Sequence, residues 1–269
     1  MTHNARLESR ALISVSGEDW ASFLQGLITQ DVETLAPGEL RFGGLLTPQG
    51  RLLYDLFILG EADGCRLDVA AEHRAAIIQR LMIYRLRAKV KIEADETPVF
   101  AAWPAAPDIA GRTDPRLPDL GLRFYGTEAT PNAEEAAYDA HRLACGVPGP
   151  ADWSSDKTYP IEANFDLLNG IDFKKGCFVG QETTSRMKRR GQIKSRMAPV
   201  KLGGDVPAAE TEIMTGTLRA GQVTSVIADR AMALLRLDRI SGDLTLGDTA
   251  VEVDMPEWLK SAAEIRPQS

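Results

Sequence analysis

One cysteine-bearing segment concentrates the residues whose chemistry stands out in this sequence. Residues 174–196 contain Cys177 and eight basic residues but only one acid, although the whole chain carries a net charge of −7. Positive charge close to a thiol favours the thiolate, so Lys174, Lys175 and Arg186 are expected to stabilise that form of Cys177. The thiolate is the form that binds metal ions and attacks electrophiles. The segment therefore predicts a reactive or metal-ligating cysteine.

The surroundings of Cys177 must be weighed against a simpler interpretation. A lone cysteine is most often a small buried apolar residue, and a run of Lys and Arg is most often a solvated helix face. Here, however, Gly176 and Gly180 flank the cysteine, and glycine allows a tight turn or the close approach of a ligand. A short helix is expected over residues 181–190, ended by Gly191. This combination favours a functional site over simple packing.

The cysteine count limits what such a site can hold. Cys65, Cys145 and Cys177 are far apart, no Cys-x-x-Cys pair is present, and the chain has only three histidines. Structural zinc sites and iron–sulfur clusters usually need four such ligands. A cluster bound at Cys177 would therefore take its other ligands from a partner or a small thiol. We expect Cys65 and Cys145 to be structural.

Two carboxylates form a second set of candidates. Asp55 interrupts an apolar strand expected over residues 51–59, and a buried carboxylate is costly unless it is paired or used. Glu162 lies in the segment Pro-Ile-Glu-Ala-Asn of residues 160–164. Each has an ordinary alternative: Asp55 as a paired or edge residue, and Glu162 as a capping or surface residue. Both remain candidates for a binding pocket.

The elements expected around these residues are mixed. Strands are expected over residues 10–16, 40–46, 51–59 and 65–70, with a turn at residues 47–50 that has Pro second and Gly fourth. Helices are expected over residues 19–28 and 72–86, the second with Ile77, Ile78, Leu81 and Met82 facing inward. From residue 197 onward, short strands with glycine turns predict a small β-barrel.

Composition narrows the classes of protein. The chain has 269 residues, 44% hydrophobic and 26% charged, which is ordinary for a globular protein. Its acidic net charge argues against a general nucleic-acid binder, and no apolar run is long enough to span a bilayer. The N-terminal ten residues are polar and include Glu8, which fits neither a signal peptide nor a transit peptide. A cytoplasmic location is therefore expected.

Residues 175–182 resemble a known family signature. Lys-Gly-Cys-Phe-Val-Gly-Gln-Glu is similar to the signature of the YgfZ-type folate-binding proteins, which assist iron–sulfur cluster assembly and repair. These proteins are relatives of the glycine-cleavage T-protein, an aminomethyltransferase. Weaker similarities support the match at intervals along the chain, at residues 23–32, 142–148, 160–164, 221–225 and 233–236.

The resemblance implies both a fold and a function. The implied fold is α+β: a T-protein-like core of two intertwined lobes around a central folate opening over residues 1–195, then a small β-barrel over residues 196–269. The implied function is folate-linked assembly or repair of iron–sulfur clusters, by an assembly factor rather than a classical enzyme. Its expected partners are cluster carrier or scaffold proteins, with which it would share a transient cluster.

The resemblance also implies roles for single residues. Cys177 would be the thiolate and metal ligand, with Lys175 and Arg186 stabilising it. Tetrahydrofolate or a derivative would be bound by a second set, namely Asp55, Glu162, Gly176, Gly180 and Gln181.

Two other functions stay open. A tetrahydrofolate-dependent aminomethyl or one-carbon transferase would use Asp55, but the T-protein has Arg-Leu-Glu where this chain has Arg142-Leu143-Ala144. An RNA-binding or RNA-modification factor would use the basic residues 188–190. Aromatic residues for base stacking are sparse around them, which argues against that alternative.

Overall fold

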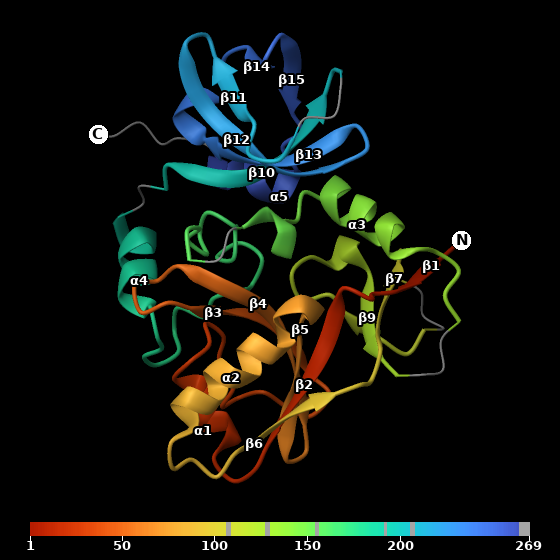
Figure 1. Ribbon diagram of the computed structural model, residues 1–269, viewed down its shortest axis with the longest axis vertical. Coiled ribbons are helices and arrows are strands. Elements are labelled where there is room, and N and C mark those ends of the chain that lie inside the picture. The colour runs from red at the N-terminus through yellow and green to blue at the C-terminus, as the bar shows by residue number, and fades with distance from the viewer. Residues whose placement is uncertain (106–108, 127–129, 154–155, 191–192, 205–207, 264–269) are drawn as a thin grey trace.

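The computed structural model describes residues 1–105, 109–126, 130–153, 156–190, 193–204 and 208–263. The described chain forms two β-sheets and a closed β-barrel, with the barrel at one end of the molecule (Figure 1). Gly191, expected to end a helix, lies outside the described residues. The expected α+β class with a C-terminal barrel is confirmed.

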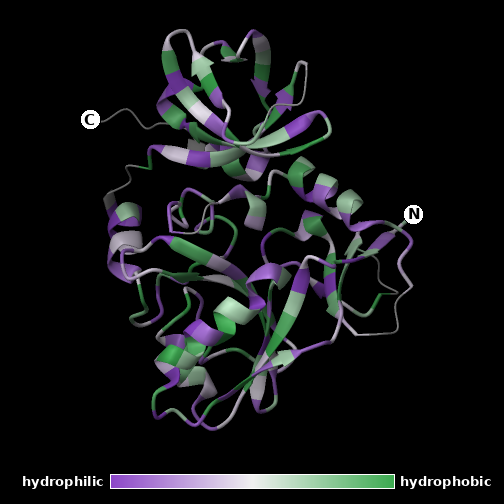
Figure 2. Cartoon of the chain, in the orientation of Figure 1, coloured by the Kyte–Doolittle hydropathy of each residue, from purple (hydrophilic) through white to green (hydrophobic). Residues whose placement is uncertain are grey.

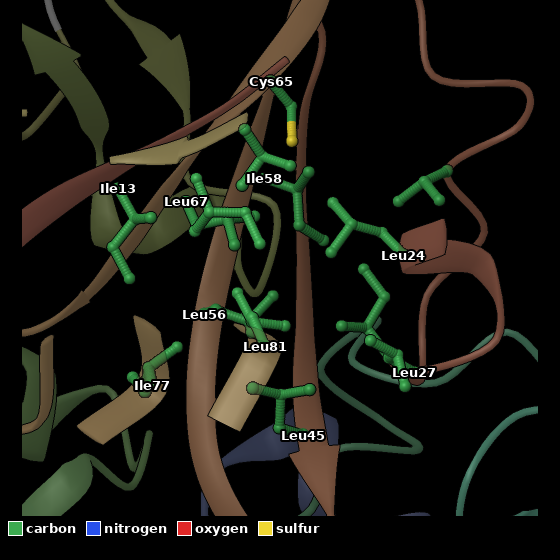
Figure 3. Close-up of a cluster of buried hydrophobic side chains, with 14 of the residues drawn as sticks. Ile13, Leu24, Leu27, Leu45, Leu56, Ile58, Cys65, Leu67, Ile77 and Leu81 are labelled. Atoms are coloured by element: carbon green, nitrogen blue, oxygen red, sulfur yellow. The ribbon is translucent and has the colours of Figure 1, made fainter. Parts of the chain in front are cut away.

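The first sheet has five strands in the order β3-β4-β5-β2-β6. Their bounds are Leu40–Leu46 for β3, Leu52–Glu61 for β4, Gly64–Ala70 for β5, Arg10–Ser16 for β2 and Lys91–Asp95 for β6. Because side chains alternate along a strand, each strand sends one set of residues to each face. Helices α1 (Trp20–Gln25) and α2 (Arg74–Arg85) cover one face, where they bury an apolar cluster that includes Ile13, Leu56, Leu67 and Ile77 (Figure 3).

The second sheet has four strands in the order β1-β7-β9-β8. Their bounds are His3–Arg6 for β1, Val99–Trp103 for β7, Leu122–Tyr125 for β9 and Arg112–Thr113 for β8, and helix α3 (Glu135–Ala144) follows. The chain thus begins in this sheet, builds the whole first sheet with β2 to β6, and then returns. The two sheets are therefore interleaved along the chain, and the expected division into two intertwined lobes stays a prediction.

The barrel closes in the order β10-β13-β12-β11-β14-β15. Its strands are Ser195–Leu202 for β10, Arg230–Arg236 for β13, Leu218–Ile227 for β12, Glu212–Thr215 for β11, Leu244–Leu246 for β14 and Thr249–Val253 for β15, with helix α5 at Glu257–Ala263. Hydrophobic and hydrophilic bands alternate along these strands, as expected where one side faces the barrel interior (Figure 2). Helix α4 (Gln181–Arg190) precedes the barrel and matches the expected helix.

One prediction about the core is wrong. Met82 was expected to face inward from α2, but it is 42% exposed, whereas Ile77 and Leu81 are fully buried. The helix begins only at Arg74, after a short 3-10 turn, and its buried stripe follows the i, i+4 pair. Position 82 therefore lies beyond the edge of that stripe.

Candidate functional site

Cys177 lies exposed on a loop that is packed tightly against the turn between β3 and β4. Gly180 has φ +83°, and a Cβ atom there would lie 2.6 Å from the Thr47 carbonyl oxygen and 2.9 Å from the Gly50 Cα. Real Cβ atoms do not approach so closely, so this contact requires glycine at position 180. A Cβ on Gly176 would instead meet nothing within 4 Å. The backbone beside the cysteine is therefore open to an approaching partner or ligand.

Lys175 anchors this loop. Its buried ammonium donates hydrogen bonds to the carbonyl oxygens of Gln25, Ile28 and Gln30, each at 2.8 Å. Burial lowers the pKa of Lys175 to about 8, against the opposing effect of nearby carboxylates. All three donors of the ammonium are thus committed to the last residue of α1 and the chain that follows it. Lys175 therefore fixes the loop, a role that was not predicted from the sequence, and its expected stabilisation of the Cys177 thiolate stays a prediction.

Further bonds join the same two segments. Val179 donates its backbone N–H to the Gly26 oxygen at 3.1 Å, and Asp172 donates to the Thr29 oxygen at 3.0 Å. The Thr29 hydroxyl donates to the Gly170 oxygen at 2.6 Å. Residues 23–32 and 175–182, which the sequence singled out separately, are therefore one structural unit, in which the first segment supports the loop that carries the cysteine.

The three cysteines lie in different environments. Cys65 is buried in the apolar cluster under α2, Cys145 is half-buried, and Cys177 is exposed. Burial raises the pKa of the Cys65 thiol, and burial followed by the charge of Asp119 raises the pKa of Cys145. Across the described residues, no group of three or more His, Cys, Asp or Glu side chains is arranged to hold a metal ion. Cys177 therefore offers a single accessible sulfur ligand.

Helix α4 follows directly after this loop. Gln181, its first residue, donates from Nε2 to the Gly176 carbonyl oxygen at 3.3 Å and so helps to close the turn around the cysteine. Arg186 is exposed on the helix. The Lys188 ammonium lies 3.8 Å from the carboxylate of Asp166, so part of the basic surface is already paired.

Asp55 lies on the other face of the first sheet, within a buried network of charges. The Arg10 guanidinium contacts Asp55 at 3.0 Å and Asp68 at 2.6 Å, and Arg123 of the second sheet contacts Asp68 at 2.6 Å. The Arg123 guanidinium also stacks on the ring of Phe57 at 3.8 Å. Asp55 is thus paired inside the interface between the lobes.

Two more residues extend this network. Asp114 and Arg116 form a buried pair at 2.8 Å, and Arg123 approaches Asp114 at 3.9 Å. Burial alone would raise the pKa of Asp68 and Asp114, but the neighbouring guanidinium groups outweigh it and hold both pKa values below the ordinary range. We call the whole set the central ion network. Its members are Arg10, Asp55, Asp68, Asp114, Arg116 and Arg123.

Five members of the central ion network were not predicted from the sequence. A signal was present, because Asp68 and Arg123 each interrupt a short apolar strand in the way that Asp55 does. The partners could not be assigned from sequence, since β2, β4, β5 and β9 meet only in the folded chain.

Glu162 lies near the start of β4. Its Oε2 accepts a hydrogen bond from the Tyr159 backbone N–H at 2.8 Å, which is the capping role considered from the sequence. Burial raises the pKa of Glu162, partly offset by that bond and by Arg51. Its backbone oxygen accepts from Met197 of β10 at 2.8 Å, so this turn links the core to the barrel. Within the described residues, Asp55 and Glu162 each use one carboxylate oxygen and leave the other without a hydrogen-bond partner.

The expected site residues thus fall into two groups. The first group lies on the loop against the β3–β4 turn and on α4, and consists of Lys175, Gly176, Cys177, Gly180, Gln181 and Arg186. The second group is Asp55 in β4 and Glu162 beside the start of that strand. The β3–β4 hairpin connects the two groups.

In the described part of the chain, no helix is long and apolar enough to cross a membrane.

Comparison with known proteins identifies relatives along nearly the whole chain. Iron-sulfur cluster assembly factor IBA57, mitochondrial, from Mus musculus is 30% identical, over 96% of this chain and 86% of the mouse protein. The IBA57 homolog, mitochondrial, from Neurospora crassa is 33% identical over 72% of this chain, which spans 52% of that relative. A family model described as the CAF17 C-terminal beta-barrel domain matches residues 194–261.

A solved structure shows a similar fold. The crystal structure of glycine cleavage system aminomethyltransferase T from Bartonella henselae aligns with a TM-score of 0.77, over 96% of this chain and 86% of that one. The sequence identity is 17%, so the similarity concerns the fold. The expected T-protein-like fold is therefore confirmed.

The relatives correct the expected cytoplasmic location. Both are named as mitochondrial proteins, which contradicts that expectation. The expectation was based on the polar N-terminal residues, but these residues are part of the folded structure. His3–Arg6 form strand β1, and Leu7 is buried. Their polar character reflects a sheet edge and carries no information about compartment.

Proposed function

This chain belongs to the family of the iron–sulfur cluster assembly factor IBA57, and we propose that it assists cluster assembly or repair by offering Cys177 as a cluster ligand. The observation that carries the proposal is the contrast among the cysteines. Cys177 is exposed on an anchored loop, whereas Cys65 is buried and Cys145 is half-buried. Thiolates are the usual ligands of iron–sulfur clusters.

Because this chain supplies only one ligand from the loop, the cluster would be shared with a second protein. An iron–sulfur cluster usually needs four ligands, and this loop supplies one. The remaining ligands come from a carrier or scaffold protein that binds beside the loop. A cluster held in this way is transient, which suits transfer to a client rather than storage.

An anaerobic pull-down of the chain from cell extract tests the proposal. The wild-type chain should be recovered with a cluster carrier protein and with bound iron, and Cys177→Ser should lose most of the iron. Cys145→Ser is the matched control and should retain it. Equal iron recovery with Cys177→Ser would contradict the proposed role of this thiol.

Tetrahydrofolate, or a derivative, is the second ligand that we propose. The fold is shared with an aminomethyltransferase of the glycine cleavage system, and Asp55 and Glu162 each keep one carboxylate oxygen free of partners in the described chain. Carboxylate oxygens accept hydrogen bonds from N–H groups such as those of a pterin ring. Asp55 and Glu162 would therefore hold the pterin, with the loop glycines beside it.

Calorimetry with tetrahydrofolate tests the folate proposal. Asp55→Asn and Glu162→Gln should each weaken binding about tenfold, because each replaces a charged acceptor by a neutral one. Asp63→Asn, at an exposed position on the far end of the sheet, is the matched control. Unchanged affinity in both test variants would remove the two carboxylates from the site.

No observation on the described residues specifically supports the two alternative functions, a one-carbon transferase and an RNA-binding factor. The similarity to the aminomethyltransferase is one of fold at 17% identity, so it does not extend to the reaction of that protein. For the RNA-binding alternative, the Lys188 ammonium is engaged by the Asp166 carboxylate, so part of the basic surface of α4 is paired within the chain. Cluster assembly is therefore the function that the exposed cysteine and the relatives support best.

A further inference from the structure

The end of helix α2 exposes an unusual run of apolar side chains. Six large apolar residues are exposed in the described chain, and four of them lie within five consecutive positions. They are Met82 (42% exposed), Ile83 (72%), Tyr84 (37%) and Leu86 (87%), which we call the α2 patch. Isolated exposed apolar residues are common on protein surfaces, but a contiguous group of this kind marks an interaction site.

The backbone at Leu86 adds to this observation. Leu86 has φ +42° and ψ −104°, a conformation that non-glycine residues rarely adopt. Such conformations are concentrated at functional sites, where the surrounding structure holds them in place. Here the strained residue presents the most exposed side chain of the patch to solvent. Packing within the chain does not explain that placement.

The α2 patch adjoins the cysteine loop. A shallow surface cleft is lined by Leu27, Leu45, Leu81, Tyr84 and Val179, together with two neighbours. Leu27 and Leu45 lie at the end of the apolar cluster away from Cys65 (Figure 3). Val179 stands two positions after Cys177, so one surface joins the patch to the cysteine loop. The cleft has room for only about 10 Å³, far too little for a small-molecule ligand.

Arginine side chains lie beside this surface, since Arg80 lines the cleft and Arg87 follows Leu86. No acid occurs between Arg74 and Glu93, whereas five basic residues occur from position 80 to position 91. Among the described residues, Arg80 and Arg87 have no ion-pair partner, while Lys89 pairs with Glu18 and Lys91 pairs with Glu93. Lys174 is exposed on the cysteine loop, which also supplies Val179 to the cleft. A basic rim around an apolar centre is complementary to an acidic protein surface with an apolar centre.

We propose that the α2 patch and the adjoining cleft dock the protein that supplies the remaining cluster ligands, an acidic carrier with apolar side chains around its cluster. The inference rests on the proposed function, because the carrier must lie beside Cys177 to share a cluster with it. Docking places the apolar side chains of the carrier over Ile83 and Leu86, and its acidic rim against Arg80 and Arg87.

Binding without a cluster separates docking from ligation. The Kd of the full-length chain for a purified acidic cluster carrier in its metal-free form should rise at least about tenfold in the double variant Ile83→Ser/Leu86→Ser. Leu218→Ser, an exposed leucine on the barrel, is the matched control and should leave the Kd unchanged. Cys177→Ser should also leave it unchanged, because no cluster is present. Raising the salt concentration should weaken wild-type binding, as should Arg80→Ser/Arg87→Ser.

Four outcomes would overturn the docking proposal. Two concern the carrier: the wild type fails to bind it in its metal-free form, or the Ile83/Leu86 variant binds it with an unchanged Kd. Two would assign the patch to another occupant. In one, the wild type self-associates and the Ile83/Leu86 variant does not; in the other, the wild type binds vesicles that contain anionic lipid and the variant does not.

The docking surface and the proposed function can fail separately. If the Ile83/Leu86 variant binds the carrier normally and still forms a Cys177-dependent cluster, only the docking surface is wrong. If docking follows the prediction but no cluster depends on Cys177, the proposed function fails instead.

Discussion

The three cysteines of this chain should react at very different rates. Cys177 is exposed, while burial raises the pKa of both Cys65 and Cys145 and so removes thiolate from them at neutral pH. Alkylation with iodoacetamide near neutral pH, followed by peptide mass spectrometry, should label Cys177 first and Cys65 last. Equal labelling, or labelling of Cys145 before Cys177, would contradict this order.

For single residues, the sequence predicted the candidate site only in part. The glycine-flanked, basic surroundings of Cys177 were visible in the sequence, and they predicted a reactive or metal-ligating cysteine. The role of Lys175 was not visible, because its three carbonyl partners lie 145 to 150 positions earlier in the chain. Charge near a cysteine in sequence does not show which atoms that charge contacts in the fold.

Among the elements, the cysteine loop depends on a single buried lysine. Lys175→Met should lower the free energy of unfolding by about 2 kcal/mol, because three backbone carbonyls lose a charged donor. The Val179 amide should also exchange its hydrogen faster, since its bond to Gly26 lies in the released loop. Lys174→Met changes an exposed neighbour and is the matched control for both hydrogen exchange and denaturant unfolding. Equal behaviour of the two variants would show that Lys175 does not anchor the loop.

The sequence predicted regular elements better than it predicted their surfaces. Strands 10–16 and 40–46 and the helix 181–190 match the structure, because local alternation and glycine punctuation determine them. Met82 was misplaced because helical periodicity does not show where the covered stripe ends. The same error assigned one member of the α2 patch to the core, and the other three members received no prediction.

Across the whole molecule, the central ion network should make stability depend on acid pH. Asp68 and Asp114 have lower pKa values in the folded chain than in the unfolded chain, where Asp titrates near about 4. Their contribution is therefore present above about pH 4 and is lost as the pH falls through the folded pKa values. The free energy of unfolding should fall steeply below about pH 4.

A variant isolates this contribution. Asp68→Asn leaves Arg10 and Arg123 without a shared carboxylate and should cost about 3–5 kcal/mol at neutral pH. Its difference from the wild type should narrow as the pH falls below about 4. Asp63→Asn is the exposed control for urea unfolding. A wild-type free energy that does not change between about pH 5 and about pH 3 would contradict the predicted dependence.

The large-scale architecture was predicted mainly through the resemblance to a family. Family membership and the T-protein-like fold are both confirmed, whereas hydrophobic patterning alone indicated only a mixed fold with a C-terminal barrel. The boundary expected between residues 195 and 196 stays a prediction. One apolar cluster contains Phe42 and Phe57 of the core together with Met197 and Met232 of the barrel, so the two parts share a packed interface.

The central claim is that Cys177 completes a cluster whose other ligands belong to a partner. Reconstitution with iron and sulfide under anaerobic conditions, followed by visible circular dichroism, measures this directly. The isolated chain should hold no stable cluster, and its mixture with a cluster carrier should give a new signal that Cys177→Ser abolishes and Cys145→Ser preserves. A stable cluster on the isolated chain, or a normal mixed-cluster signal with Cys177→Ser, would contradict the account.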